Sequence, residues 1–162
     1  MAWSQASGKN AGTLYTPAQR ARRDATVWTR VQGVLAIAQF VVFAISLCLV
    51  LSYLATGAGY VVATLSILVK TALLFTIMVT GAIWEKVVFG QYLLAPAFFW
   101  EDVMSFLVIA LHGAYVAALL GGWLGPVSLM ILALAAYAAY ALNAAQFVLK
   151  LRTARLEGQG AT

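Results

Sequence analysis

The chain has 162 residues, of which 64% are hydrophobic and only 9% are charged. A soluble domain of this length cannot bury so much apolar surface, so the composition excludes an ordinary soluble enzyme and indicates one integral membrane domain. The net charge of +5 comes from Lys and Arg residues near the ends of apolar runs, where anionic lipid headgroups explain them and nucleic-acid binding is not expected.

The N-terminal region divides into a tail and a short helix. Residues 1–12 are mostly small or polar, which predicts a flexible tail. The run Thr16-Pro17-Ala18-Gln19 has the pattern of a capping box, with Thr as N-cap, Pro at the first helical position and Gln three residues after the cap. The helix that follows is basic and amphipathic, and it is expected to lie at the membrane interface. Its arginines have two open interpretations, which are anchoring in lipid headgroups and binding an anionic group of a substrate.

Four apolar stretches are each long enough to cross a bilayer as a helix, which takes about 20 residues. The predicted spans are residues 31–55, 60–83, 98–120 and 126–149. We therefore predict an all-α integral membrane four-helix bundle, with a single domain over residues 13–152 and a C-terminal tail over 153–162. Lys and Arg concentrate in the N-terminal segment, the middle connection and the C-terminal tail, which predicts that all three face the cytoplasm.

Polar residues repeat along two of the predicted spans. In the first span they recur every seven residues, at Gln32, Gln39, Ser46 and Tyr53. In the fourth span they recur in steps of three, at Tyr137, Tyr140, Asn143 and Gln146. Both faces are expected to avoid lipid and to point into the bundle. For any single member, hydrogen bonding between helices is a simpler interpretation than ligand binding.

The third span is expected to begin at Ala95-Pro96, because proline suits the first position of a helix. Carboxylates in the first turns of that helix are favoured by its dipole. One face of the predicted helix carries Glu101, Ser105, Val108, His112 and Tyr115. His112 is therefore expected to point the same way as Glu101, about three turns deeper.

Ionisable residues inside an apolar chain need an explanation, because a charge at mid-membrane costs about 2.5 to 3.5 kcal/mol. The segment from Gly81 to Asp102 holds three of the five acidic residues, together with several aromatic side chains. Lys70 lies near the middle of the second span, where it either pairs with a neighbour to fix helix packing or serves as a counter-ion for a substrate acid. For His112, the only histidine, a functional role is favoured because an unpaired imidazole is costly in a membrane bundle.

Several sequence motifs carry a resemblance to a known family. They are Leu14-Tyr15-Thr16-Pro17, Arg22-Arg23-Asp24-Ala25, Trp28-Thr29, Val31-Gln32-Gly33, Gly81-Ala-Ile-Trp-Glu-Lys-Val-Val-Phe-Gly and Pro96-Ala-Phe-Phe-Trp-Glu-Asp102. Together they resemble the 3-vinyl bacteriochlorophyllide hydratase family of bacteriochlorophyll synthesis. The resemblance covers about residues 14–149. It implies a hydro-lyase that adds water to the C3-vinyl group of a chlorophyllide or bacteriochlorophyllide and gives a 3-(1-hydroxyethyl) product.

The resemblance also implies the setting of the enzyme. A multi-pass protein of the bacterial inner or intracytoplasmic membrane is expected, with its N- and C-termini in the cytoplasm. The expected partners are the chlorophyllide substrate and membrane lipid, with a homo-oligomer or an association with other pigment-synthesis enzymes left open. No redox cofactor is expected, and magnesium is expected only as part of the macrocycle.

A hydratase needs an acid, a base and a dry pocket, and the chain offers candidates for each. The acid is expected to be Glu101 or Glu85, whose partly buried setting would keep it protonated near neutrality. Asp102 or His112 would activate water, and His112 has a rival role as axial ligand to the magnesium of the macrocycle. A simpler alternative is that Glu85 forms only an interfacial ion pair with Lys86, and that Glu101 and Asp102 serve only as helix N-terminal charges.

Further residues are expected to bind the substrate. Lys86, Arg23 or Arg30 would pair with its propionate, and Trp84 and Trp100 would flank the ring. The other expected substrate-binding residues are Tyr92, Lys70 and Gln39.

A second class of function stays open at the level of the sequence. A non-enzymatic carrier or assembly factor for chlorophyll-like pigments could use the same polar-lined, aromatic bundle. A carrier needs a magnesium ligand and apolar walls, but it has little use for three acids beside one aromatic segment. The cluster of carboxylates therefore favours the enzyme.

Overall fold

The computed structural model describes residues 13–159, and the tail predicted for residues 1–12 lies outside them. The chain is all-α, as predicted, and its elements are α1 (Pro17–Ala25), α2 (Val27–Thr56), α3 (Tyr60–Phe89), α4 (Phe99–Gly121) and α5 (Pro126–Gln159). By length and composition, the four long helices are able to cross a membrane. Multi-pass membrane topology follows from these four spans.

The short helix α1 begins as the sequence predicted. The hydroxyl oxygen of Thr16 accepts from the backbone N–H of Gln19, and the Gln19 side chain accepts from the backbone N–H of Thr16. The capping box is thus complete, with Pro17 at the first helical position. Helix α1 ends at Thr26, which in turn caps the start of α2, so the chain turns sharply between the two helices.

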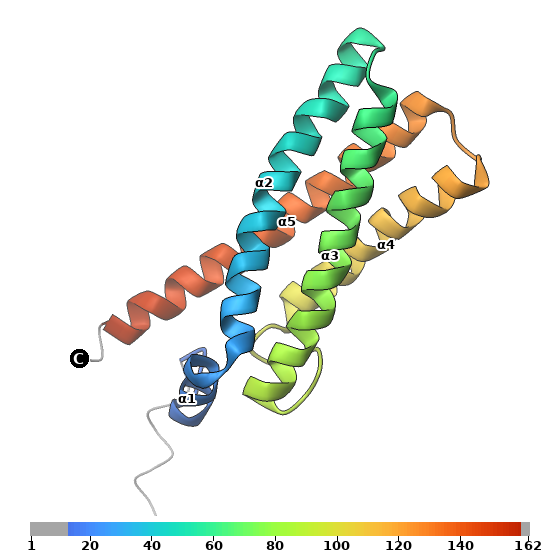
Figure 1. The fold of residues 1–162 in the computed structure, drawn as a ribbon. Helices are drawn as coiled ribbons and strands as arrows, with labels where there is room; N and C mark the ends of the chain where they lie inside the picture. The colour runs from blue at the N-terminus through green and yellow to red at the C-terminus, as the bar shows by residue number, and fades with distance from the viewer. Residues whose placement is uncertain (1–12, 160–162) are drawn as a thin grey trace, which may run out of the picture.

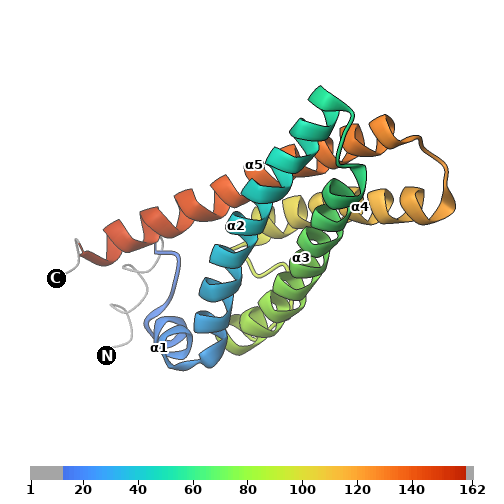
Figure 2. The same cartoon turned by 45° about the horizontal axis from the view of Figure 1, so that its top comes forward.

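The long helices form two hairpins, and α5 of the second hairpin crosses behind α2 of the first (Figure 1). Helix α2 packs along α3, and α4 packs along α5, while fewer contacts join the two hairpins through α2 with α5 and α3 with α4. The first hairpin turns at Gly57 and Gly59, whose φ angles of 73° and 86° suit glycine. In Figures 1 and 2, α1 and the connection between α3 and α4 lie at one end of the molecule, and the α2–α3 turn lies at the other.

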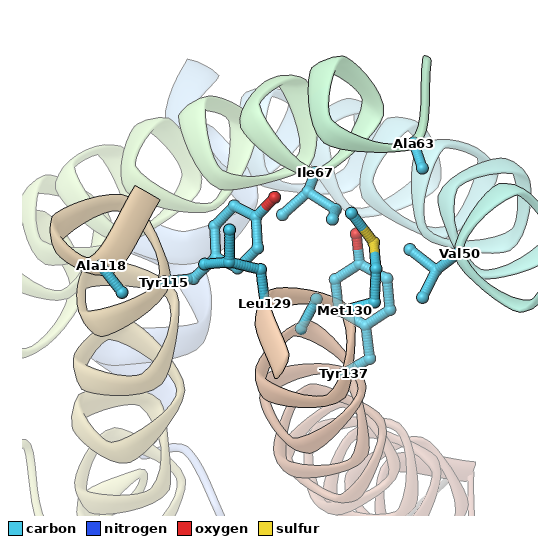
Figure 3. Close-up of a cluster of buried hydrophobic side chains, with 9 residues drawn as sticks. Val50, Ala63, Ile67, Tyr115, Ala118, Leu129, Met130 and Tyr137 are labelled. Carbon is cyan, nitrogen blue, oxygen red and sulfur yellow. The ribbon is translucent and has the colours of Figure 1, made fainter. Parts of the chain in front are cut away.

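An apolar core fills the end of the bundle near the α2–α3 turn (Figure 3). All four long helices contribute to it, through Val50, Ala63, Ile67, Tyr115, Ala118, Leu129, Met130, Ala133 and Tyr137. The Tyr137 hydroxyl lies 2.5 Å from the Ser46 hydroxyl, so its polar tip is satisfied inside the core. This end of the bundle is closed by close packing.

The predicted polar faces mostly point inward. Gln39 and Ser46 of α2 are buried, and so is the whole α4 face, with Glu101, Ser105, Val108, His112 and Tyr115. On α5, Tyr137, Tyr140 and Asn143 are buried. Gln146 is exposed, contrary to prediction. Steps of three residues fall short of a full 3.6-residue turn, so a face drawn in such steps drifts around the helix.

Two predicted boundaries also differ from the structure. Pro96 lies in the turn before α4, which begins only at Phe99. Helix α5 continues to Gln159, through residues that the sequence assigned partly to a tail. This last part is rich in Leu, Ala, Lys and Arg, all strong helix formers, so the helix continues after the apolar run has ended.

Candidate active site

A cavity of about 780 Å³ lies at the end of the bundle that carries α1. All five helices and the α3–α4 connection contribute residues to its wall. A volume of this size falls within the range of about 300 to 1,000 Å³ that is usual for small-molecule sites.

Two buried carboxyl groups open onto this cavity. Glu85, near the end of α3, and Asp102, in the first turns of α4, are only 5% and 3% exposed. The backbone N–H of Ala95 donates to Glu85 Oε2 over 3.2 Å, and that of the preceding Leu94 donates to Asp102 Oδ2 over 2.7 Å. Because adjacent amides bind the two carboxyls, the two side chains lie next to each other and interact directly.

The connection that supplies these amides has a strained backbone. Leu94 has φ 59°, a left-handed conformation that a side chain with a Cβ seldom adopts and that costs of order 1 to 3 kcal/mol. Its N–H bond to Asp102 helps to offset that cost. The two hydrogen bonds hold the connection against the carboxyl pair despite this strain.

Aromatic side chains form one wall of the cavity. The rings of Trp84 and Phe98 meet edge to face with centroids 5.7 Å apart, and Phe98 stacks on Phe147 of α5 at 5.8 Å. Trp84 is also fixed by a bond from its indole N–H to the Thr29 hydroxyl, over 2.9 Å. This wall offers flat apolar faces beside the carboxyl pair, which suits a conjugated ring.

Arginines stand at the part of the cavity nearest α1. Arg20 and Arg23 of α1 and Arg155 of α5 all line it. Arg23 already pairs with Asp24 over 2.7 Å and lies 4.7 Å from the centre of the Tyr15 ring. The buried Nε of Arg20, by contrast, has no hydrogen-bond partner among residues 13–159. Burial raises the pKa of the Tyr15 phenol, so this ring stays neutral beneath the arginines.

The inner part of the cavity carries two buried amides. Gln39 is 1% exposed and accepts from Lys70 Nζ over 2.5 Å, which leaves its own Nε2 without a partner. Asn143 is 8% exposed and donates from Nδ2 to Ser105 Oγ over 2.8 Å, which leaves its Oδ1 without a partner. Two amides that line the cavity therefore keep one buried donor and one buried acceptor without a partner in the described part of the chain.

The structure places the residues singled out in the sequence in different surroundings. Glu85, Asp102, Trp84 and Gln39 line the cavity. Lys70 stands behind Gln39, with its ammonium 3.5 Å from the centre of the Tyr140 ring.

The remaining predicted site residues lie away from the cavity wall. Glu101 is paired with Lys150 over 2.6 Å, and His112 is fully buried with its Nδ1 bonded to Val108 O. Lys86 donates to the backbone carbonyl of Gly90, and Tyr92 and Trp100 are 60% and 69% exposed.

Several cavity residues were not singled out as site residues from the sequence. Arg155 and Phe147 belong to the last part of α5, more than 40 residues from either carboxyl along the chain. Asn143 was recognised as part of an inward face, which is the one signal that pointed to it. Nothing in the spacing of these residues indicated that α1 and the end of α5 meet over the same cavity.

Comparisons with known proteins agree with one another. Residues 15–153 match the family described as 2-vinyl bacteriochlorophyllide hydratase (BCHF). The chain is 70% identical to the 2-vinyl bacteriochlorophyllide hydratase of Cereibacter sphaeroides over 149 residues, which cover 91% of this chain and 92% of that protein. It is 65% identical to the protein of the same name from Rhodobacter capsulatus over 144 residues, covering 89% and 84% of the two chains. No solved structure matches the chain significantly. With identity this high over nearly its whole length, the chain belongs to the 2-vinyl bacteriochlorophyllide hydratase family.

Proposed function

We propose that this chain adds water to the vinyl group of a bacteriochlorophyllide, with Glu85 and Asp102 transferring the protons. The activity follows from membership of the hydratase family. The locant of the vinyl group is 2 or 3 according to the numbering used for the macrocycle. The observation that carries the assignment of the site is the pair of adjacent buried carboxyls, which opens onto an aromatic-walled cavity.

Hydration of a vinyl group on a conjugated ring needs two proton transfers and no change of oxidation state overall. A proton added to the terminal carbon gives a methyl group and leaves positive charge on the ring-side carbon, where the conjugated macrocycle spreads it. The oxygen of water then bonds to that carbon, and one water proton must leave. The site therefore needs an acid and a base within reach of two adjacent carbons.

The surroundings of the two carboxyls favour different protonation states. Asp102 lies in the first turns of α4, where the helix dipole stabilises negative charge, and it accepts the shorter of the two backbone bonds. Glu85 lies near the C-terminal end of α3, where the dipole disfavours negative charge. Two like charges in so small a buried space disfavour each other, so the pair readily holds one proton. We assign that proton to Glu85, which makes Glu85 the acid and Asp102 the base.

One catalytic cycle then returns both carboxyls to their starting protonation states. Glu85 gives its proton to the terminal vinyl carbon, and Asp102 takes a proton from the attacking water. The proton passes from Asp102 back to the adjacent Glu85, and the pair is ready again. The aromatic wall of Trp84, Phe98 and Phe147 holds the macrocycle and excludes bulk water, which would otherwise compete for the protons.

The arginines suit the propionate of the substrate. Arg20 has an unpaired buried N–H, and Arg155 reaches the same cavity from the other end of the chain. A carboxylate placed between them would accept charge-assisted hydrogen bonds. Lys86, one of the sequence candidates for this role, is instead bonded to Gly90 O, and Arg30 does not line the cavity.

We also propose a bacterial inner-membrane location with the cavity at the cytoplasmic end. Arg20, Arg22, Arg23, Lys86, Arg152 and Arg155 all lie on α1, the last turns of α3 or the end of α5, which the figures draw toward one end of the molecule (Figures 1 and 2). The turns at residues 57–59 and 122–125 carry no charge. This asymmetry supports cytoplasmic termini by the positive-inside rule.

Turnover of pigment by the purified protein tests the activity and the site together. Wild-type protein in detergent, given a vinyl bacteriochlorophyllide, should yield a product heavier by one water. Glu85→Gln should lower the rate by about 10² to 10⁴ while pigment still binds, because a general acid contributes about that factor. Glu101→Gln is the matched control and should retain most of the rate, because its amide oxygen still accepts from Lys150. Pigment that binds wild-type protein but stays unchanged would favour a carrier.

The methyl ester of the same pigment tests the arginines. Esterification removes the charge, so the ester should bind wild-type protein more weakly than the free acid by about 1.5 to 3 kcal/mol, the usual value of a hydrogen bond to a charged group. In an Arg20→Gln variant the difference between acid and ester should shrink. An unchanged preference for the acid in that variant would show that the carboxylate binds elsewhere.

A further inference from the structure

We infer that Asn143 binds the attacking water together with Asp102, an inference that rests on the proposed hydration site. Asn143 lines the cavity from α5 and is 8% exposed, and its Oδ1 has no hydrogen-bond partner. A buried amide oxygen without a partner destabilises the fold unless water or a ligand satisfies it. The position therefore calls for a hydrogen-bond donor inside the cavity.

A short chain of hydrogen bonds fixes which end of the Asn143 amide binds Ser105 and which end keeps no partner. The Ser105 hydroxyl donates its single hydrogen to the backbone carbonyl of Glu101, over 2.8 Å. Its oxygen is then free only to accept, and it accepts from Asn143 Nδ2 over 2.8 Å. If the amide were reversed, its oxygen would face the lone pairs of the hydroxyl, so Oδ1 is held away from Ser105.

The same helix face brings Asn143 close to the base. Ser105 follows Asp102 by three residues on α4, so the two side chains are neighbours on one face, and both line the cavity. Asn143 reaches this face through its bond to Ser105. A water molecule here would donate one hydrogen to Asp102 and the other to Asn143 Oδ1, which directs a lone pair of its oxygen toward the carbon.

The second buried amide of the inner wall has the opposite polarity. Lys70 can only donate, so it holds Gln39 Oε1 and leaves the Gln39 N–H groups for the cavity. A donor would bind the oxygen lone pair that must attack the carbon. Of the two amides, Asn143 is the one whose free atom is able to orient a nucleophilic water.

The role of Asn143 predicts a specific defect. After Glu85 protonates the vinyl group, the cationic intermediate has two outcomes. Water adds to the ring-side carbon and a proton goes to Asp102, or the new methyl group loses a proton and the vinyl group returns. In D₂O the second outcome leaves deuterium on the terminal vinyl carbon when one of the original hydrogens departs. The ratio of deuterated substrate to alcohol therefore measures how well water is placed.

The experiment compares wild type with Asn143→Leu in D₂O, with both pigments analysed by mass spectrometry. The variant should form alcohol about tenfold more slowly, because one hydrogen bond to the attacking water is lost. The ratio of deuterated vinyl pigment to alcohol should rise, while pigment affinity stays the same. Gln146→Leu, an exposed substitution one turn further along α5, is the matched control and should match wild type in all three measurements.

Each outcome decides the question. A slower variant with an unchanged ratio would mean that Asn143 only supports the structure, and the inference would be wrong. If Asn143→Leu does not fold, Ser105→Ala keeps the amide and frees it to turn, so a raised ratio is expected there, and an unchanged ratio overturns the inference. Wild-type protein that forms neither alcohol nor deuterated substrate would instead refute the proposed site of hydration.

Discussion

Ionisable side chains are buried in two regions of this molecule, and the regions differ in what surrounds them. Glu85 and Asp102 face a cavity near α1, whereas Lys70 and His112 lie inside the bundle and do not line it. All four are at most 5% exposed. Burial alone therefore does not distinguish a reactive group from a structural one, but access to a space that a substrate can enter does.

The partners of these groups differ as well. Lys70 is held by the Gln39 amide and lies over the Tyr140 ring, and His112 is bonded to the carbonyl one turn back on its own helix. Lys70 is thus held by two other helices, α2 and α5, whereas His112 is bonded only through Nδ1, and its Nε2 has no partner among the described residues. The carboxyls instead accept hydrogen bonds from Leu94 and Ala95, in the strained connection between α3 and α4. This connection is not helical, so helical periodicity in the sequence could not predict these contacts.

The largest expected effect tests the difference between the cavity carboxyls and the groups buried inside the bundle. Asp102→Asn should lower the rate of hydration by about 10² to 10⁴ because it removes the proposed base. His112→Leu should leave the rate of the folded protein close to wild type, because His112 does not line the cavity. Rates are measured on protein whose folded fraction is known from gel filtration in detergent. Loss of pigment binding in His112→Leu would contradict the comparison and would favour His112 as a magnesium ligand.

An intermediate effect is expected at the ion pair between α4 and α5. Lys150→Met leaves Glu101 unpaired in a site where its side chain is 8% exposed. Removing one partner of a buried pair commonly costs 3 to 5 kcal/mol, and here about 2 to 3 kcal/mol is expected because the Lys150 side chain is 28% exposed. Thermal unfolding in detergent measures the loss.

The double variant Lys150→Met with Glu101→Gln sharpens this test. It removes the unpaired charge, so much of the lost stability should return, and the folded protein should still hydrate the vinyl group. A large loss of rate in the folded double variant would place Glu101 in the reaction after all.

The smallest expected effect concerns Tyr15, which packs beneath the arginines. Burial raises the pKa of its phenol above the ordinary value of 10.0. The phenol therefore loses its proton at lower pH in the unfolded chain than in the folded protein. The neutral phenol's contribution to the free energy of unfolding is complete below pH 10, and it is lost as the pH rises through the pKa of the folded state. Tyr15→Phe should reduce the fall in stability at alkaline pH and leave stability at neutral pH nearly unchanged, as unfolding measured across that range would show. An identical alkaline loss in both proteins would contradict this assignment.

Much of the fold could be predicted from local patterns. The capping box at Thr16, the four apolar stretches and the inward faces of α2 and α4 are short-range signals, and the structure confirms them. The predictions that were wrong also depended on local patterns. Pro96 lies in the turn before α4, and Gln146 is exposed.

The sequence by itself determined the fold class, because the length and periodicity of apolar runs depend only on neighbours along one helix. It also identified Glu85 and Asp102 as candidates, since any carboxyl near so many apolar residues is conspicuous. Only the tertiary structure decided which charged groups share a cavity. It brought Arg20 of α1 and Arg155 of α5 to one cavity, paired Glu101 with Lys150 and bonded Asn143 to Ser105. These contacts depend on how helices far apart in the chain pack together, and helical periodicity carries no information about the helix that a given face meets.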